Sequence, residues 1–271
     1  MRTLPFLLIA TACSPPQARS PVALETPPEP GMVAIAALTA PGLSLDTDTW
    51  QGADDSRGTV WRIRVHPGAL SVLPSASLQP LSTFQDGLDG DAWVIANGGF
   101  YDPSGTAMSL VVHDGQEHHA LGSGSGVVTG PSPVHVVHKD AYVPGPTEAL
   151  QSIDRVVDNA TNLVTMAPAA RRAARTVLAV DGETVWIAVF ADERSIVATP
   201  AGARLVATGG FGPTLYEAAE YVRTELAAQQ ALNMDGAIST QFAVHTPSGD
   251  FVVQGERDII NAVVLTPTTV E

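Results

Sequence analysis

The sequence is poor in several residue types, and each shortage excludes a class of protein. Cysteine occurs once, at Cys13, so the chain has neither an internal disulfide framework nor a zinc site built from cysteines. Lysine also occurs once, at Lys139, and the Gly-Lys-Ser/Thr run of the P-loop nucleotide-binding proteins is absent. Charged residues make up 15% of the 271 positions and hydrophobic residues 45%. This balance predicts a globular core and not intrinsic disorder.

Positive charge is scarce as well. The chain has 14 Lys and Arg against 28 Asp and Glu, which gives a formal net charge of −14. The mean field of such a chain repels a phosphate polymer, so we expect no nucleic-acid partner. A single local pocket of positive charge is compatible with this balance, because a pocket sets its own potential.

The N-terminal segment has the pattern of an export signal. Arg2 precedes an apolar stretch over 4–12, which is too short for a bilayer span of ~20 residues but has the length of a secretory signal core. Small residues at 10–12 run directly into Cys13. The pattern resembles a bacterial lipoprotein signal, with 1–12 removed and Cys13 lipidated. It implies a lipid anchor in the bacterial cell envelope, facing the periplasm or the outer surface; without lipidation the protein would be secreted.

A proline-rich segment follows the cysteine. Six prolines fall between positions 14 and 31. Proline favours an extended, semi-rigid chain, so we predict a tether over 13–31. The folded domain is then expected over 32–271.

Beyond the tether, short apolar runs alternate with turn residues. Apolar residues alternate with arginine over 61–65, which is the period of a half-buried strand. Asp181-Gly182 separates two apolar runs and predicts a β-hairpin. Further strands are predicted at 91–96, 109–112, 231–234 and 259–265.

One helix is predicted with clear start signals. Thr214 and Glu217 fit a capping box, and the following apolar residues recur at helical spacing to Leu226. We expect this helix to end near Gln229. The sequence has no repeat of 20–50 residues, which excludes solenoids and propellers. The predicted fold class is therefore α+β, a single domain with a mainly antiparallel sheet and covering helices.

Two parts of the sequence look like known functional motifs, a nucleophile elbow and a histidine metal site, but neither fits the required pattern. The segment 122–126 looks like a nucleophile elbow, but Gly124 stands where the serine is required. His118 and His119 are adjacent to each other and close to His113. Adjacent residues of a regular strand point to opposite faces, so we interpret these histidines as solvated residues and not as a metal site.

Three segments remain that could carry chemistry, namely 96–103, 171–176 and 231–240. Each has an ordinary interpretation alone, since Asn97-Gly98 and Asp235-Gly236 are common turn pairs. Together, in order and spacing, they resemble the phosphodiester glycosidase domain family over 90–265. The other matching positions are Asp114-Gly115, Gln151-Ser152, Arg175-Thr176, Thr214 to Glu217, Ser239-Thr240, Arg257 and Ile260-Asn261-Ala262.

The resemblance implies a hydrolase that cleaves a sugar 1-phosphodiester in cell-envelope or extracellular glycans, with a glycan or glycophosphate as its partner. Its catalytic residues would be Asp235 as the carboxylate, Arg175 as the phosphate ligand and Asn97 as the group that orients water or a sugar hydroxyl. The implied substrate-binding residues are Gly98, Gly99, Tyr101, Gly236, Ser239 and Thr240. Arg172 and Arg257 are further candidates for binding phosphate.

One departure from the family pattern leaves alternatives open. The family usually has three successive glycines after the aspartate, but Ala237 and Ile238 occupy the second and third positions here. Glycine permits a positive φ and a branched residue resists it, so we expect a reshaped loop. A non-catalytic glycan-binding lipoprotein and a purely structural lipoprotein are therefore alternatives. A third is a phosphodiesterase that holds a divalent cation such as calcium on Asp102, Asp114 and Asp235. We expect no organic cofactor, because no dinucleotide fingerprint follows a strand.

Overall fold

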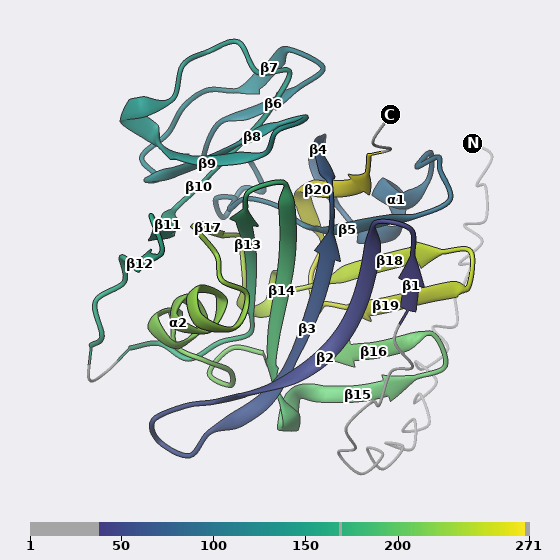
Figure 1. Ribbon diagram of the computed structural model, residues 1–271, viewed down its shortest axis with the longest axis vertical. Helices are drawn as coiled ribbons and strands as arrows, with labels where there is room; N and C mark the ends of the chain where they lie inside the picture. The colour runs from purple at the N-terminus through teal and green to yellow at the C-terminus, as the bar shows by residue number, and fades with distance from the viewer. Residues whose placement is uncertain (1–37, 168–169, 207, 269–271) are drawn as a thin grey trace, which may run out of the picture.

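The computed structural model describes residues 38–167, 170–206 and 208–268 (Figure 1). The predicted signal segment 1–12, Cys13, the tether 13–31 and the expected start of the domain at residue 32 lie outside the described residues. Among the described helices, none has the length and apolar character needed to cross a membrane.

The largest sheet has eight strands, and all of its pairings are antiparallel. In spatial order they are β1 (Leu38–Ala40), β2 (Leu43–Gln51), β3 (Arg57–Val65), β14 (Thr184–Asp192), β13 (Arg175–Asp181), β17 (Gln230–Asn233), β11 (Asp154–Asp158) and β12 (Thr161–Asn162). The predicted hairpin is confirmed, since β13 and β14 pair from Arg175 opposite Phe190 to Asp181 opposite Thr184.

A second sheet has seven strands. In spatial order they are β15 (Ile196–Thr199), β16 (Gly202–Leu205), β19 (Gly249–Gln254), β18 (Phe242–Thr246), β5 (Trp93–Asn97), β20 (Ile259–Pro267) and β4 (Gly68–Gln79). All of its pairings are antiparallel except that of β16 with β19.

A third, smaller sheet of five strands stands at one end of the molecule (Figure 1). In spatial order its strands are β7 (Gln116–His119), β6 (Val111–His113), β10 (Glu148–Ser152), β8 (Gly126–Gly130) and β9 (His135–His138).

Helical structure is sparse in the described chain. The α-helices are α1 (Leu81–Gln85) and α2 (Leu215–Glu225), and the 3-10 turns are η1 (Lys139–Ala141), η2 (Glu193–Ser195) and η3 (Ala237–Ser239). The predicted capping box is present in full, because the Glu217 N–H donates to Thr214 Oγ1 and the Thr214 N–H donates to the Glu217 carboxylate. The helix ends four residues earlier than predicted, and Ala227 just beyond it has a φ of +52°.

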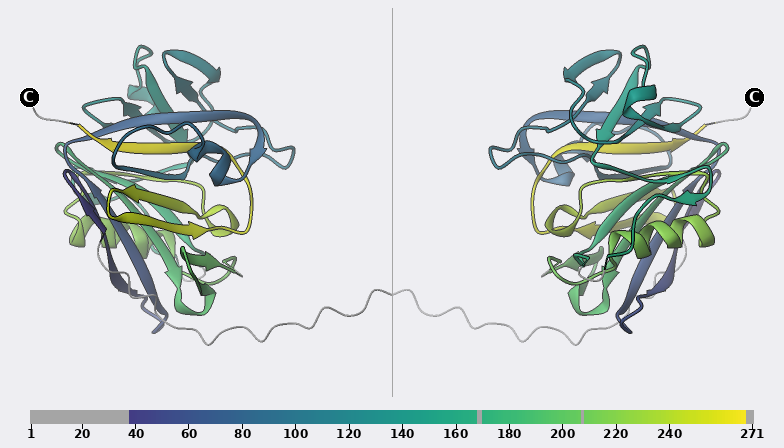
Figure 2. Two further views of the ribbon diagram at one scale, coloured as in Figure 1. Left: turned by 90° about the vertical axis from the view of Figure 1, so that its right-hand side faces the viewer. Right: turned by 90° about the vertical axis from the view of Figure 1, so that its left-hand side faces the viewer.

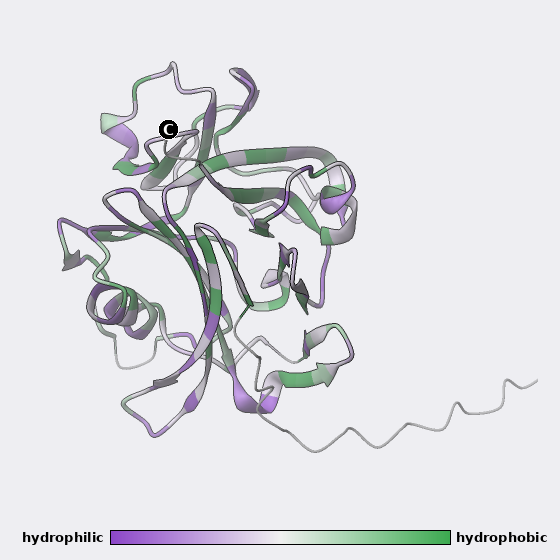
Figure 3. Cartoon of the chain, turned by 45° about the vertical axis from the view of Figure 1, so that its right-hand side comes forward, coloured by the Kyte–Doolittle hydropathy of each residue, from purple (hydrophilic) through white to green (hydrophobic). Residues whose placement is uncertain are grey.

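The two large sheets pack face to face and enclose the main core. Trp61 of β3, Leu178 of β13 and Phe242 of β18 belong to this core. On the outer face of the eight-stranded sheet, α2 covers Val177 and its neighbours (Figure 2). On the outer face of the seven-stranded sheet, α1 covers a smaller cluster that contains Ile95. Hydrophobic stretches accordingly concentrate in the strands of both sheets (Figure 3).

The fold of the described residues is therefore mainly β, which corrects the predicted α+β class: helices cover both large sheets, but they are short and few. The antiparallel sheets themselves are confirmed. Strand β13 was correctly predicted as half of the hairpin, although it lacks the usual strand alternation. Its residues 176–180 are buried on both faces, by the core on one side and by α2 on the other, so they read as a continuous apolar run without strand alternation.

Candidate active site

Asn97, at the end of β5, joins segments that are far apart in the sequence. Its side-chain N–H donates to the backbone oxygen of Asp235 at 2.6 Å, and its Oδ1 accepts from Thr176 Oγ1 at 2.8 Å. The same Oδ1 accepts from the Gln241 N–H at 3.1 Å. Asn97 is fully buried. The amide therefore holds three segments together and is not exposed to a ligand, contrary to the prediction that it orients water or a sugar hydroxyl.

The backbone N–H groups of Gly98 and Gly99 are also hydrogen-bonded within the protein. The Gly98 N–H donates to the backbone oxygen of Asn261 at 3.0 Å, and the Gly99 N–H donates to Asn261 Oδ1 at 2.6 Å. A Cβ on Gly98 would lie 2.0 Å from Asn261 Oδ1, which explains why glycine stands there. Both N–H groups are already used, so the implied substrate-binding role of these two glycines does not extend to their N–H groups.

Asp235 follows β17 and lies beside the end of β5. Its N–H donates to the Gly98 oxygen at 2.9 Å, and the Gly236 N–H donates to its Oδ1 at 2.8 Å. Burial raises the pKa of Asp235 to about 6, while hydrogen bonds from Ser239 and Gly236 partly oppose this rise. The carboxyl can therefore exist in either protonation state near neutral pH.

The loop after Asp235 keeps a glycine-like backbone without the glycine. Ala237 has a φ of +53°, the left-handed region that glycine favours. Its N–H donates to the backbone oxygen of Ala174 at 2.8 Å, so the loop runs beside the start of β13. Ile238 continues η3 and has no positive φ. The strain expected from the missing glycines therefore occurs at Ala237, which adopts a positive φ, and not at Ile238.

Ser239 and Tyr101 meet close to the carboxyl. Ser239 hydrogen-bonds the Asp235 side chain, and its Oγ lies 3.3 Å from the Tyr101 hydroxyl. Tyr101 is partly exposed, as a residue that contacts substrate requires. Thr240 differs, because it is fully buried and its Oγ1 has no hydrogen-bond partner among the described residues. Its predicted role in substrate binding stays a prediction, because the hydroxyl has no partner in the described chain that would occupy it.

Arg175 begins β13 and faces a carboxylate that sequence reasoning missed. Asp154 pairs with Asn233, and Asn233 pairs with Val177. Directly paired residues share a sheet face, and Arg175 lies on that face two residues before Val177. Burial and the charge of Arg171 lower the pKa of Arg175, whereas Asp154 opposes them. Burial raises the pKa of Asp154.

Two polar atoms of this group are left without partners. Arg175 Nε and Asn233 Oδ1 are buried and have no hydrogen bond within the described residues. The guanidinium donates through Nη2 to the Arg171 backbone oxygen at 2.8 Å. Asn233 belonged to one of the matching segments but had no assigned role, and Asp154 lay outside all three of them.

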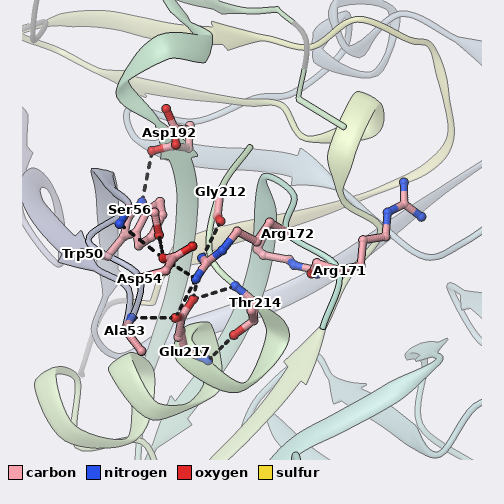
Figure 4. A network of polar contacts seen from close by, with 12 residues as sticks. Trp50, Ala53, Asp54, Ser56, Arg171, Arg172, Asp192, Gly212, Thr214 and Glu217 are labelled. Atoms are coloured by element: carbon pink, nitrogen blue, oxygen red, sulfur yellow. Dashed lines mark hydrogen bonds and ion pairs between the residues drawn. The ribbon is translucent and has the colours of Figure 1, made fainter. Parts of the chain in front are cut away.

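Arg172, the neighbouring candidate for phosphate, serves the scaffold instead (Figure 4). Its guanidinium donates to both Glu217 oxygens, at 2.9 and 3.1 Å, to Asp54 at 2.6 Å and to the Gly212 oxygen at 3.1 Å. These bonds tie the β2–β3 turn to the start of α2. Figure 4 shows the side chain of Arg171 pointing away from this network.

Arg257 is exposed, and its backbone closes the site loop. The Arg257 N–H donates to the Ile238 oxygen at 3.1 Å, and its own oxygen accepts from the Gln241 side chain at 2.8 Å. With Gln241 it lines a surface hollow of about 270 Å³. It therefore stays a candidate for contact with a substrate at the rim of the site.

The three aspartates of the cation hypothesis do not come together. Asp102 accepts from Ser104 and Thr106 within its own loop, and Asp114 lies in the turn between β6 and β7. Among the described residues, the three-ligand cluster is instead His113, Asp114 and Glu148. Glu148 accepts from the N–H groups of Val72 and Asp114, a pattern that fits the joining of strands.

The fold and site together define a β-sandwich protein with a largely desolvated carboxylate and a half-buried arginine where its strands end. The family model for phosphodiester glycosidase matches residues 90–266, which is more than half of the chain. The chain therefore belongs to the phosphodiester glycosidase family, and the resemblance found in the sequence is confirmed.

Two solved structures share the fold. The catalytic domain of zebrafish N-acetylglucosamine-1-phosphodiester α-N-acetylglucosaminidase, auto-inhibited by its pro-peptide, superposes with a TM-score of 0.58 at 12% identity, covering 83% of this chain and 84% of that one. A hypothetical protein from Synechocystis has the same TM-score and identity, and the match covers 83% of this chain but only 62% of that protein. No curated protein matches the chain at a significant level.

Proposed function

We propose that this protein is a hydrolase that cleaves the glycosidic C–O bond of a sugar 1-phosphodiester, with Asp235 as its catalytic carboxylate. The observation that carries the proposal is the meeting of three family segments at Asp235, whose backbone oxygen accepts from Asn97 and whose carboxyl accepts from Gly236. Asn97, Thr176 and Gly236 belong to those segments, and their hydrogen bonds join the ends of β5, β13 and β17.

The chemistry suits a site with one principal carboxylate. A phosphomonoester is a stable leaving group, so the sugar–oxygen bond can break without the strong general acid that a poor alkoxide needs. Water supplies the oxygen that bonds to the sugar carbon, and the electron pair of the broken bond leaves with the phosphate. Asp235 accepts the proton of that water, which requires its ionised form. Its pKa of about 6 makes this form the main one at neutral pH.

Arg175 is the group that we assign to the phosphate. Its Nε–H is buried and has no partner among the described residues, so a phosphate oxygen would satisfy it. A guanidinium stays charged even when burial lowers its pKa, and its planar fork suits two oxygens at once. Ser239 and Tyr101 would contact the sugar, beside the carboxyl.

We further propose that the substrate lies in the cell envelope and that Cys13 carries the lipid anchor, as the N-terminal pattern predicts. The test is to express the wild type and Cys13→Ser with a radiolabelled fatty acid. Label and membrane association in the wild type alone would support the anchor. An unlabelled wild-type protein in the soluble fraction would contradict it.

The test of the reaction uses a sugar 1-(4-nitrophenyl) phosphate in ¹⁸O-labelled water. Cleavage of the C–O bond places ¹⁸O in the free sugar and releases nitrophenyl phosphate. Cleavage of the P–O bond places ¹⁸O in phosphate and releases yellow nitrophenolate. We expect the first result, with loss of turnover in Asp235→Asn and Arg175→Leu and retention in the control Asp181→Asn, whose side chain is exposed at the end of β13.

Contrary outcomes point to the alternatives. Label in phosphate, with loss of activity on chelation, would favour a metal-assisted phosphodiesterase. Folded wild-type protein that binds sugar phosphodiesters but releases no product would favour the glycan-binding alternative. Turnover of Asp235→Asn at the wild-type rate would remove Asp235 from the mechanism.

A further inference from the structure

A hollow of about 190 Å³ lies between the five-stranded sheet and the edge of the seven-stranded sheet. Residues of β4, β20 and the loop after Tyr101 line one side, and residues of β6 and β7 line the other. The residues that matter for its chemistry are Asn261, His118, His119, Thr106, Val111 and Ile260. No role in the proposed reaction has been assigned to it.

Two irregularities in the strands open this hollow. Val111 pairs with His119 but Val112 pairs with Glu117, so His118 is the extra residue of a β-bulge. In β20, Ile259 pairs with Gln79 but Asn261 pairs with Pro74, so β4 departs from its partner over several residues. Bulges turn side chains away from regular alternation and are common beside binding sites.

The bulge changes what the adjacent histidines can do. Regular alternation places His118 and His119 on opposite faces, which is why the sequence suggested solvated residues. With the bulge, both line the same hollow. The assumption of opposite faces is wrong, because it required an uninterrupted strand, whereas the exposure of His118 agrees with the interpretation as a solvated residue.

The hollow offers both a donor and an acceptor. Asn261 is almost fully buried, and its Oδ1 accepts from the Gly99 N–H, which leaves its Nδ2 with no acceptor among the described residues. His119 Nδ1 lies 3.2 Å from the Ala120 carbonyl oxygen and must donate to it, so Nε2 of the neutral ring is an acceptor. A sugar hydroxyl both donates and accepts, so it can bond with either of these groups.

Charge and size narrow the ligand class. The lining contains no carboxylate, lysine or arginine, which disfavours an ion or a phosphate. Val111 and Ile260 are buried and supply an apolar wall of the kind that covers the C–H face of a sugar ring. The volume is below the ~300 Å³ at which drug-sized pockets begin, so it admits one ring and not a chain.

The hollow is also close to the proposed reaction. Gly98 accepts from the Asp235 N–H and donates to the Asn261 oxygen, so one residue separates the catalytic loop from the wall of the hollow. We propose that this hollow is a second saccharide subsite, which binds one neutral sugar ring on the alcohol side of the phosphodiester. Its place in the reaction rests on the proposed function, whereas its sugar binding does not.

The first test measures binding and needs no turnover. The histidine ring signals of the full-length chain are followed by NMR during titration with methyl α-D-mannopyranoside, methyl α-D-glucopyranoside and, separately, inorganic phosphate. We expect saturable shifts of His118 and His119 with at least one glycoside and none with phosphate. His119→Phe removes the acceptor, Ala76→Trp fills the rim, and each should weaken binding at least about tenfold. His135→Phe is the control, because His135 is exposed at the start of β9 and does not line the hollow, and it should bind as the wild type does.

The second test links the hollow to the reaction. Wild type, His119→Phe and Ala76→Trp are compared on phosphodiesters whose alcohol half is either methanol or a methyl glycoside. We expect the variants to lose about tenfold in kcat/KM on the sugar-bearing substrate alone. Saturable sugar binding with no turnover of either substrate would contradict the proposed function but support the sugar-binding subsite. Absence of histidine shifts with every glycoside, shifts with phosphate only, or equal losses on both substrates would overturn the subsite.

Discussion

Replacing Asp235 with asparagine should stabilise the protein at neutral and basic pH while it abolishes turnover. The carboxyl is largely buried, and burial disfavours its charged form. Asparagine has nearly the same shape, keeps an oxygen that can accept from the Gly236 N–H, and never ionises. The substitution therefore removes a buried charge without opening a cavity.

The magnitude follows from the pKa. Burial raises the pKa of Asp235 from 3.8 to about 6. Below pH 3.8 the carboxyl is protonated in both the folded and the unfolded chain, and its ionisation costs nothing. As the pH rises through 6, the unfolded chain is already ionised and the folded chain must follow. Two pH units at ~1.4 kcal/mol each give a destabilisation of about 3 kcal/mol above pH 6.

The assay is thermal unfolding of wild type and Asp235→Asn from pH 4 to pH 8. For a domain of this size 1 kcal/mol shifts Tm by ~2–4 °C, so we expect the variant to melt roughly 6–12 °C higher at pH 8 and nearly level with the wild type at pH 4. The control Asp181→Asn alters a side chain that is exposed and should show a small difference at both values. A Tm difference that does not grow with pH would refute the reasoning from burial.

Three further substitutions test the structural assignments around the site. Ala237→Gly should stabilise the fold by about 1 kcal/mol in urea unfolding, because it relieves a φ of +53°. Arg172→Met should cost about 2–4 kcal/mol in the same assay, because it leaves Glu217 without its partner, yet it should keep kcat in the folded fraction. Gly98→Ala should cost about 3 kcal/mol or prevent folding, because its Cβ would lie 2.0 Å from Asn261 Oδ1.

The sequence predicted correctly those features that depend on a few neighbouring residues. The capping box of Thr214 and Glu217 and the turn at Asp181-Gly182 depend on local geometry, and both are present. The end of α2 was misplaced because the residues up to Gln229 are good helix formers. Tertiary packing overrides that preference, since Ala227 turns the chain into β17.

The site required information that no local pattern holds. The resemblance identified the segments, but the hydrogen bonds of Asn97 cross 138 residues to Asp235 and 79 to Thr176. A turn pair such as Asn97-Gly98 gives no sign of whether its polar groups face a ligand or the protein. Asp154 was missed for the same reason, because it reaches Arg175 only through the pairing of β11 and β13 with β17.

The hydrogen bonds of a polar side chain show whether it has a structural role or is available to a ligand, which its residue type alone does not show. Asn97 is buried with both ends of its amide bonded to protein, so its role is complete without a ligand. The buried side-chain atoms without a partner among the described residues are Trp61 Nε1, Arg155 Nε, Arg175 Nε, Asn233 Oδ1 and Thr240 Oγ1. All but the first belong to the segments around Asp235 or directly follow Asp154. An unpaired buried polar group costs about 1–3 kcal/mol, and such costs gather here, where a bound phosphodiester could recover them.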